Sequence, residues 1–186
     1  ANAPKNFEIF FRKSIDYGDT FGNILNLSNS PGDSLDPQIM VPKDGPNYLY
    51  VSWSDCIEKN DDPICNIYFA KSFDKGLSFG TPALISMITP TTHIPFTGNQ
   101  QSQFLPSSLL LSVTNADTHQ VVHNSVNPEI TSSEDGKYVY ILWEVDLTSS
   151  GLSDIFLKKS SNYGESFDDT VNPVSYTHLR AHETEA

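Results

Sequence analysis

Large apolar side chains alternate along two similar stretches of the chain. Residues 47–53 and 138–143 carry large residues at both odd and even positions, and each stretch follows a short turn that contains Asp-Gly. This period of two predicts β-strands, and large residues on both faces predict strands that are buried on both sides. The Asp-Gly pair predicts a tight connection from a preceding strand.

A second pattern occurs three times, each time after an alternating run. Segments 9–21, 67–79 and 155–167 continue with Ser, then Asp or Asn, Gly, Ser or Thr, and Phe at fixed spacing. We call these the repeat turns. Their residues are Ser14, Asp16, Gly18, Thr20 and Phe21; Ser72, Asp74, Gly76, Ser78 and Phe79; and Ser160, Asn162, Gly164, Ser166 and Phe167. Asp and Asn accept backbone N–H groups within such turns, and Gly permits a positive φ, so we expect a structural role.

The order of the patterns predicts the architecture. Segments 36–55 and 127–146 resemble each other, and a repeat turn follows each of them. One unit is therefore strand, Asp-Gly turn, strand, polar loop, strand, repeat turn and strand, which makes a four-stranded antiparallel sheet. Sheets with two apolar faces bury both by stacking on neighbours, and radial stacking gives a β-propeller. The predicted fold class is all-β, a partial β-propeller of about two and a half four-stranded blades.

The repeat turns resemble the Asp-box, or BNR repeat, of the sialidase-like β-propeller superfamily. SIDYGDTF and SFDKGLSF match its pattern, and SSNYGESF has Asn162 where Asp is usual. The resemblance extends from residue 6 to about residue 173. It implies that these turns join the third and fourth strands of each blade on the face away from the active site. Asp16 and Asp74 are therefore expected to be turn acceptors rather than catalytic acids.

The repeats divide the chain. We expect half a blade at 6–28, a blade at 36–86, an insertion at 87–126 and a blade at 127–173, so that residues 1–173 are a piece of a larger propeller. The insertion is interpreted as a functional loop, a β-hairpin or a blade without its repeat turn. Residues 174–184 resemble translated sequencing-adaptor sequence, and 174–186 are interpreted as a non-native tail.

Antiparallel connectivity places the other loops together. Loops at 29–36, 54–66, 87–127 and 144–154 share one face, which the resemblance implies is the substrate face. The candidate binding residues on this face are all acidic: Asp33, Asp36, Asp55, Glu58, Asp61, Asp62, Glu144 and Asp146. A hydrolase of neutral sugars needs two facing carboxylates, and Asp33 or Asp36 with Glu144 or Asp146 are the candidates.

The net charge of the chain limits the classes of ligand that it can bind. The chain has 11 Lys and Arg against 23 Asp and Glu, a formal net charge of −12. Such a surface repels phosphate backbones and anionic lipid, and no apolar run is long enough to span a bilayer. We therefore expect a glycan or protein ligand, with no nucleic acid and no membrane insertion.

Cys56 and Cys65 flank a polar segment and are the two cysteines of the chain. A disulfide between them fits an oxidising compartment and hence an extracellular or cell-surface protein, and two free thiols are the alternative. We expect no metal site: the spacing of His119 and His123 places them far apart on a strand. No cofactor is expected, with calcium at the oxygen-rich segment 59–63 as the alternative.

Sialidase chemistry, as the resemblance describes it, requires an arginine triad and often an Arg-Ile-Pro motif. The chain has no such motif, and Arg12 is its one arginine outside residues 174–186. The leading hypothesis is therefore a secreted or cell-surface, non-catalytic propeller that binds a glycan or protein. The alternative is an exo-sialidase-like glycoside hydrolase whose arginines lie in other blades. Trp53 and Trp143 occupy equivalent repeat positions, which predicts packing between blades rather than sugar stacking.

Overall fold

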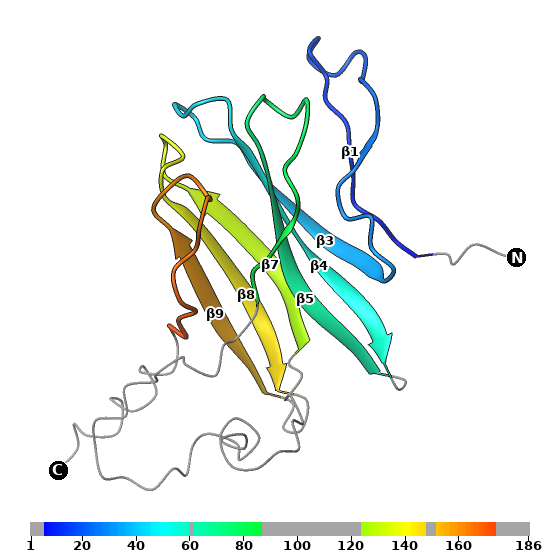
Figure 1. Ribbon diagram of the computed structural model, residues 1–186, viewed down its shortest axis with the longest axis vertical. Coiled ribbons are helices and arrows are strands. Elements are labelled where there is room, and N and C mark those ends of the chain that lie inside the picture. Colours follow the sequence, from blue (N-terminus) through cyan, green and yellow to red (C-terminus); the bar gives the residue numbers. More distant parts are fainter. Residues whose placement is uncertain (1–5, 60–61, 87–123, 148–151, 174–186) are drawn as a thin grey trace, which may run out of the picture.

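The computed structural model describes residues 6–59, 62–86, 124–147 and 152–173, and these residues form β-strands and turns. Nine strands in this part of the chain form three antiparallel sheets, which lie beside one another (Figure 1). No helix that could cross a membrane occurs in the described ranges. The all-β, antiparallel architecture predicted from the alternating pattern is confirmed.

Sheet 1 consists of two short strands. β1 (Phe10–Phe11) pairs antiparallel with β2 (Leu25–Asn26), and a repeat turn lies between them. These strands correspond to the third and fourth strands of the predicted unit.

Sheet 2 has four strands in the order β3-β4-β5-β6. They are β3 (Asp33–Met40), β4 (Leu49–Lys59), β5 (Asp62–Ser72) and β6 (Ala83–Leu84). The sheet lies within the segment expected to form one blade.

Sheet 3 has three strands and the beginning of a fourth. They are β7 (Asn124–Ser132), β8 (Val139–Leu147) and β9 (Leu152–Ser160). Val171 then forms an antiparallel bridge with Leu157, with backbone N–H···O distances of 2.8 and 2.9 Å. This bridge lies where the repeat predicts the fourth strand.

The predicted loops at 29–36, 54–66 and 144–154 are wrong in their extent. β3 already begins at Asp33, and the ladder of β4 and β5 continues to the pair Lys59↔Asp62. β8 and β9 pair as far as Leu147↔Leu152. Polar strand ends looked like loops in the sequence, but the antiparallel ladder satisfies their backbone groups as well as it does those of apolar residues. The segment 124–126, expected within an insertion, belongs to β7, and the rest of that insertion lies outside the described residues.

A β-bulge interrupts β3 and β7 at equivalent positions. Asp36 and Asn127 both have φ of 52°, each precedes a proline, and the register shifts at both places. Proline has no N–H to donate to a ladder, and a bulge removes the need for one. This bulge was not predicted from the sequence, although the dipeptides Asp36-Pro37 and Asn127-Pro128 are its visible signal.

β4 is buried on both faces. Leu49, Val51 and Trp53 pack with Ile9 and Leu27 of the first-sheet region. On the opposite face, Tyr50, Ile67 and Phe69 pack with four residues of β8, namely Val139, Ile141, Trp143 and Val145. Two-sided burial is therefore confirmed for this strand, and stacking between sheets supplies the core.

β8 is buried on one face. Its residues Tyr140 and Leu142 are half-buried, because no described sheet packs on that side. The expectation of two-sided burial is thus wrong for residues 138–143 in this structure. Trp53 and Trp143 are 0% and 1% exposed within the stacked faces, which confirms their predicted packing role.

We expect Trp143→Ala to lower the free energy of unfolding by about 3–5 kcal/mol, because it leaves a cavity between sheets 2 and 3. Urea denaturation measures this change. Val41→Ala is the control, since Val41 is exposed and its truncation should change stability by less than about 0.5 kcal/mol. Equal effects of the two substitutions would contradict the inter-sheet core.

Candidate functional site

The repeat turns share one hydrogen-bond pattern. In the second turn the Ser72 hydroxyl donates to Asp74 Oδ1 at 2.8 Å and accepts from the Gly76 N–H at 2.7 Å. Asp74 also accepts from the backbone N–H and the hydroxyl of Ser78, at 2.8 and 2.6 Å. Asp16 is held in the same way by Ser14 and Thr20.

Asn162 preserves the third turn with one hydrogen bond reversed. Its Oδ1 accepts from the Ser160 hydroxyl at 2.9 Å and from the Ser166 N–H at 3.0 Å, as the aspartates do. Its Nδ2 donates to the Ser166 hydroxyl at 2.8 Å, whereas Asp74 accepts from the corresponding Ser78. An uncharged residue therefore holds the same turn.

The phenylalanine that ends each turn packs on the preceding sheet where one is described. The rings of Phe79 and Phe11 are 5.1 Å apart, and those of Phe167 and Phe69 are 5.2 Å apart, both edge to face. Phe21 of the first turn is exposed, since no described sheet precedes sheet 1. These contacts give the repeat turns a structural role.

The three repeat turns lie at one end of the sheets, which we call the turn end (Figure 1). The β4–β5 and β8–β9 hairpins close at the opposite end, where β3 and β7 begin, and we call this the hairpin end (Figure 1). A functional site at the hairpin end is therefore separate from Asp16 and Asp74, the aspartates of the repeat turns.

Two carboxylates meet one serine at the hairpin end, where sheet 1 adjoins sheet 2. The Ser30 hydroxyl donates to Asp55 Oδ1 at 2.7 Å, and the Ser30 N–H donates to Glu8 Oε2 at 3.3 Å. Glu8 also accepts from the Ser28 hydroxyl, and from Asn6 Nδ2 at 2.9 Å. We call Asn6, Glu8, Ser28, Ser30 and Asp55 the Ser30 cluster.

The two carboxyl groups of the Ser30 cluster have pKa values shifted in opposite directions. Burial raises the pKa of Asp55, the hydrogen bond from Ser30 opposes this rise, and the charge of Glu8 adds to it. Burial also acts to raise the pKa of Glu8, but hydrogen bonds from Ser28, Ser30 and Asn6 outweigh it and lower this pKa. Burial, and then the nearby Asp55, raises the pKa of Tyr68. A carboxyl group with a raised pKa therefore lies close to one with a lowered pKa.

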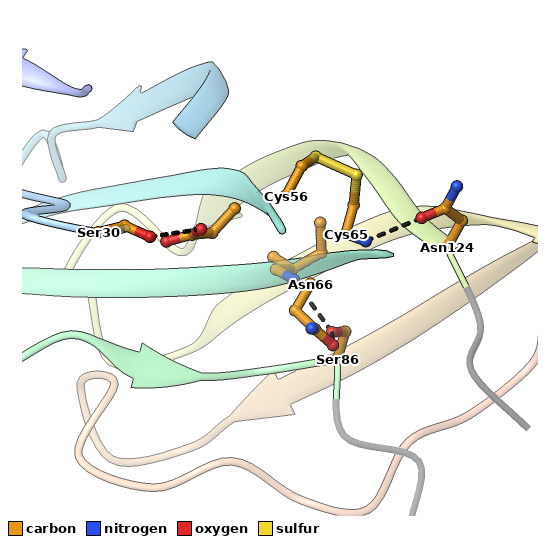
Figure 2. The surroundings of a disulfide bond; sticks show 8 residues. Ser30, Cys56, Cys65, Asn66, Ser86 and Asn124 are labelled. Atoms are coloured by element: carbon orange, nitrogen blue, oxygen red, sulfur yellow. Dashed lines mark hydrogen bonds between the residues drawn. A yellow bond between two sulfur atoms is a disulfide. The ribbon is translucent and has the colours of Figure 1, made fainter. Parts of the chain in front are cut away.

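A disulfide joins Cys56 to Cys65 across the β4–β5 ladder, where the two residues are directly paired. The Cys65 N–H donates to the side chain of Asn124 at 2.8 Å, which links this hairpin to the first residue of β7 (Figure 2). Beside it, the Ser86 hydroxyl donates to Asn66 Oδ1 at 3.2 Å (Figure 2). The same hydroxyl accepts from the Ile67 N–H. The hairpin end is thus fixed by a covalent bond and by hydrogen bonds between strands.

A second pair of hydrogen-bonded polar side chains, Asn127 and Glu144, lies at the hairpin end of sheet 3. Asn127 Nδ2 donates to Glu144 Oε2 at 2.9 Å, and hydrogen bonds from Asn127 and Ser153 lower the pKa of Glu144. Both residues border a hollow of ≈ 420 Å³ with Glu129, Leu142, Trp143 and Ile155.

The acidic residues predicted to share a binding face have different surroundings in the structure. Asp33 Oδ1 accepts the Phe7 N–H at 2.8 Å, Asp36 is exposed in the bulge, and Glu58 is exposed on β4. Asp55 is buried in β4 at 8% exposure rather than displayed on a loop. Asp62 and Asp146 lie in strands, and Asp61 lies outside the described residues.

The proposed sugar-hydrolase pairs place Asp33 or Asp36 on sheet 2 and Glu144 or Asp146 on sheet 3. Independently of these pairs, Ser30 joins Asp55 and Glu8 by hydrogen bonds, a juxtaposition that was not predicted from the sequence. Glu8 precedes an alternating run and belongs to no recognised motif, so no signal in the sequence could have paired it with Asp55.

No three His, Cys, Asp or Glu side chains gather as a metal site in residues 6–59, 62–86, 124–147 and 152–173. His119 and His123 lie outside the described residues, and so do residues 60 and 61 of the calcium alternative at 59–63. Residues 174–186 also fall outside them. Arg12, the one arginine in the described part, donates to the carbonyls of Gly22 and Phe21 near the first repeat turn.

Comparison with known proteins identifies the fold. No protein family matches the chain, and no curated protein matches it. Among solved structures, the complex of the GH93 alpha-L-arabinofuranosidase of Fusarium graminearum with arabinobiose is similar, with a TM-score of 0.52 and 11% identity. The fold of the described residues is a β-propeller fold. The match covers 95% of this chain and 43% of that chain, so this chain spans less than half of that protein's length.

The low pKa values of Asp16 and Asp74 in the repeat turns predict that the free energy of unfolding falls at acid pH. Hydrogen bonds, first from Thr20 to Asp16 and from Ser78 to Asp74, lower the pKa of each carboxyl from 3.8 to about 2. Because the folded-state pKa is depressed, the stabilisation is complete above 3.8 and is lost as the pH falls towards about 2. Asp74→Asn should keep the turn, as Asn162 does, and reduce this loss. Urea midpoints between about pH 2 and 5 measure it, and Asn162→Asp should increase it. An unchanged acid dependence in both variants would contradict this assignment.

The hydrogen bonds of the Ser30 cluster predict how the pKa values of Asp55 and Glu8 respond when Ser30 is replaced. In Ser30→Ala the pKa of Asp55 should rise further, because the hydroxyl that stabilises its anion is lost. The pKa of Glu8 should stay low, because Ser28, Asn6 and the backbone of residue 30 remain. Carbon-13 NMR of the carboxyl groups measures both values. Ser133→Ala is the matched control: it should raise the pKa of Asp135, which Ser133 lowers, and leave Asp55 unchanged. A lower pKa of Asp55 in Ser30→Ala would refute the hydrogen-bond assignment.

Proposed function

We propose that this chain belongs to a propeller that binds a glycan at its hairpin end, without catalysis, next to the Ser30 cluster. The observation that carries the proposal is the meeting of two carboxylates, two serines and an amide where sheet 1 adjoins sheet 2. Sugar hydroxyls recognise such groups, because carboxylates accept and amides both donate and accept hydrogen bonds. A protein ligand with exposed hydroxyl or amide groups is recognised by the same chemistry.

We further infer that the repeat turns are Asp-boxes of the BNR type. Their shared hydrogen bonds, their position before the fourth strand and the propeller fold support this inference. Such turns mark the fold and lie at the end away from the Ser30 cluster, so they add nothing to ligand binding.

The similar arabinofuranosidase supports a carbohydrate ligand by analogy of fold. Its structure contains arabinobiose, a neutral sugar. Neutral glycans also suit this chain electrostatically, since a net charge of −12 repels acidic sugars. Arg12 lies near the first repeat turn and donates to backbone carbonyls there, so it does not supply a carboxylate-binding group at the hairpin end.

The Cys56–Cys65 disulfide supports a secreted or cell-surface location, because such bonds persist in oxidising compartments. The acidic net charge fits partners other than nucleic acid and anionic membranes.

The second candidate is a glycoside hydrolase, which the opposed pKa shifts of Asp55 and Glu8 favour. A pair of carboxyl groups with separated pKa values suits one acid and one anion. Asp55 would protonate the leaving oxygen, and Glu8 would act as the anion that stabilises or attacks the sugar carbon. The exo-sialidase form of this candidate needs arginines from outside the described residues.

Glycan-array binding followed by calorimetry tests the proposal with neutral oligosaccharides, including arabinobiose. We expect wild-type binding to weaken at least tenfold in Glu8→Gln, which keeps the shape of the side chain and removes its charge. Glu58→Gln is the matched control, because Glu58 is an exposed acid of the same hairpin end. No binding by the wild type, or equal weakening by both variants, would refute a glycan site at the Ser30 cluster.

Release of monosaccharide distinguishes the two candidates. Binding without release supports the non-catalytic propeller. Release that falls by about 10²–10⁴-fold in Asp55→Asn supports the hydrolase, because that range is typical of losing a general acid.

A further inference from the structure

Residues 26–28 form the sequence motif of an N-glycosylation acceptor. Asn26-Leu27-Ser28 is the one place in the sequence where Ser or Thr follows Asn two residues later, with a residue other than Pro between them. Enzymes of the secretory pathway attach a glycan to the asparagine of this motif, and they recognise it by the hydroxyl group of its third residue.

The side chain of Asn26 is exposed at the end of the outer strand of sheet 1. β2 ends at this residue. Asn26 Oδ1 accepts from the Asn29 N–H at 3.1 Å, and its Nδ2 makes no hydrogen bond within residues 6–59, 62–86, 124–147 and 152–173. Leu27 is 7% exposed and belongs to the core shared with β4. Because side chains alternate between the faces of a strand, the buried leucine fixes the segment while Asn26 stays on the surface.

The position of Asn26 stays accessible when another sheet lies beside it. Its counterpart on sheet 2 is Leu84, since both residues pair with the same position of the preceding strand. Its counterpart on sheet 3 is Asn172, the residue after the Val171 bridge. On sheets 2 and 3 a neighbouring sheet packs on this face, yet Leu84 and Asn172 are both partly exposed. A further sheet beside sheet 1 would therefore also leave Asn26 within reach of solvent.

The hydroxyl group of Ser28 is engaged in the folded chain. It accepts from the Ile9 N–H at 2.9 Å and donates to a carboxylate oxygen of Glu8. Both partners directly precede β1, so these hydrogen bonds require that β1 and β2 have paired. A transferase that recognises this hydroxyl must therefore act before the two strands pair, as the chain enters the secretory pathway.

The disulfide and the glycosylation motif fit the same compartment. Cys56 and Cys65 are bonded to each other. Disulfides form in the oxidising lumen of the secretory pathway, and asparagine in this motif is glycosylated in proteins that are secreted. N-glycosylation of this chain thus presupposes the secreted or cell-surface location proposed above.

We propose that Asn26 is N-glycosylated during secretion of this chain. The donor is an oligosaccharide that is linked through a diphosphate to a lipid. Asn26 Nδ2 forms a bond to C1 of the first sugar, and the bond between C1 and the phosphate oxygen breaks. The lipid diphosphate leaves with the electron pair of that bond, and the amide nitrogen loses one proton to a base of the transferase.

A glycan on Asn26 covers the edge of a strand. In the part of the chain that the structure describes, β2 pairs with β1 alone, so its other edge has no strand partner. Such an edge can pair with a strand of another molecule. A bulky, hydrated glycan at the end of β2 obstructs that approach.

Mass spectrometry of the full chain, produced with a cleavable secretory leader in eukaryotic cells, tests the proposal. Chain from the cells and from the medium is treated with a peptide-N-glycosidase, which converts a glycosylated asparagine to aspartate. We expect this conversion at Asn26 in the majority of molecules. Asn26→Gln and Ser28→Ala should each abolish the glycan, whereas Ser28→Thr should retain it because threonine keeps the hydroxyl group.

Asn23→Gln is the matched control, because Asn23 is an exposed asparagine of the same segment that lies outside the motif. It should leave the glycan unchanged. Since the glycan is attached before β1 and β2 pair, a variant that folds poorly still reports the modification.

A wild-type chain without glycan would overturn the proposal, and so would a glycan that persists in Asn26→Gln or Ser28→Ala. Alkylation of free thiols in the same samples shows whether Cys56 and Cys65 are bonded. Free thiols would count against the proposed location, so its failure is distinguishable from failure of the modification.

Discussion

The structure depends on burial of both faces of the second strand of a blade. β4 shows the constraint directly: its odd residues pack towards sheet 1 and its even residues towards sheet 3. From Leu49 to Ser54 neither face of β4 carries a charged residue that water could solvate. A single sheet is therefore not stable alone. Adjacent sheets must therefore lie face to face, and this requirement sets the two ends of the assembly.

The two ends are held together by different chemistry. At the turn end, local hydrogen bonds form each repeat turn, and the buried Lys71, which contacts the Tyr48 ring and the Glu165 carboxylate, joins one sheet to the next. At the hairpin end, the paired strands continue almost to the ends of the hairpins. A disulfide fixes one hairpin, and a hydrogen bond to Asn124 connects that hairpin to β7. Fixed strand ends hold polar side chains more precisely in place than free loops do, which favours this end as a ligand surface.

The Ser30 cluster illustrates how stacking creates chemistry. Glu8 comes from the segment before β1, Ser30 from the connection between sheets, and Asp55 from the middle of a hairpin. Asp55 is buried because sheet 1 covers its face, and that burial raises its pKa. Glu8 keeps its charge because three donors surround it. Two carboxyl groups of ordinary chemistry thus acquire different proton affinities from their places in the fold.

The sequence by itself determined the strands, the repeat turns and the stacked architecture. These follow from period-two burial and from turn chemistry that acts within about eight residues, so local sequence carries them. It also placed Trp53 and Trp143 in the core, because their equivalence in the repeat reflects equivalent surroundings. Tertiary structure alone decided where strands end, since polar residues such as those at 54–59 gain ladder partners that the sequence does not display. It likewise decided that Asp55 and Glu8 meet at Ser30, because which side chains meet between sheets depends on the register and stacking of segments far apart in the chain.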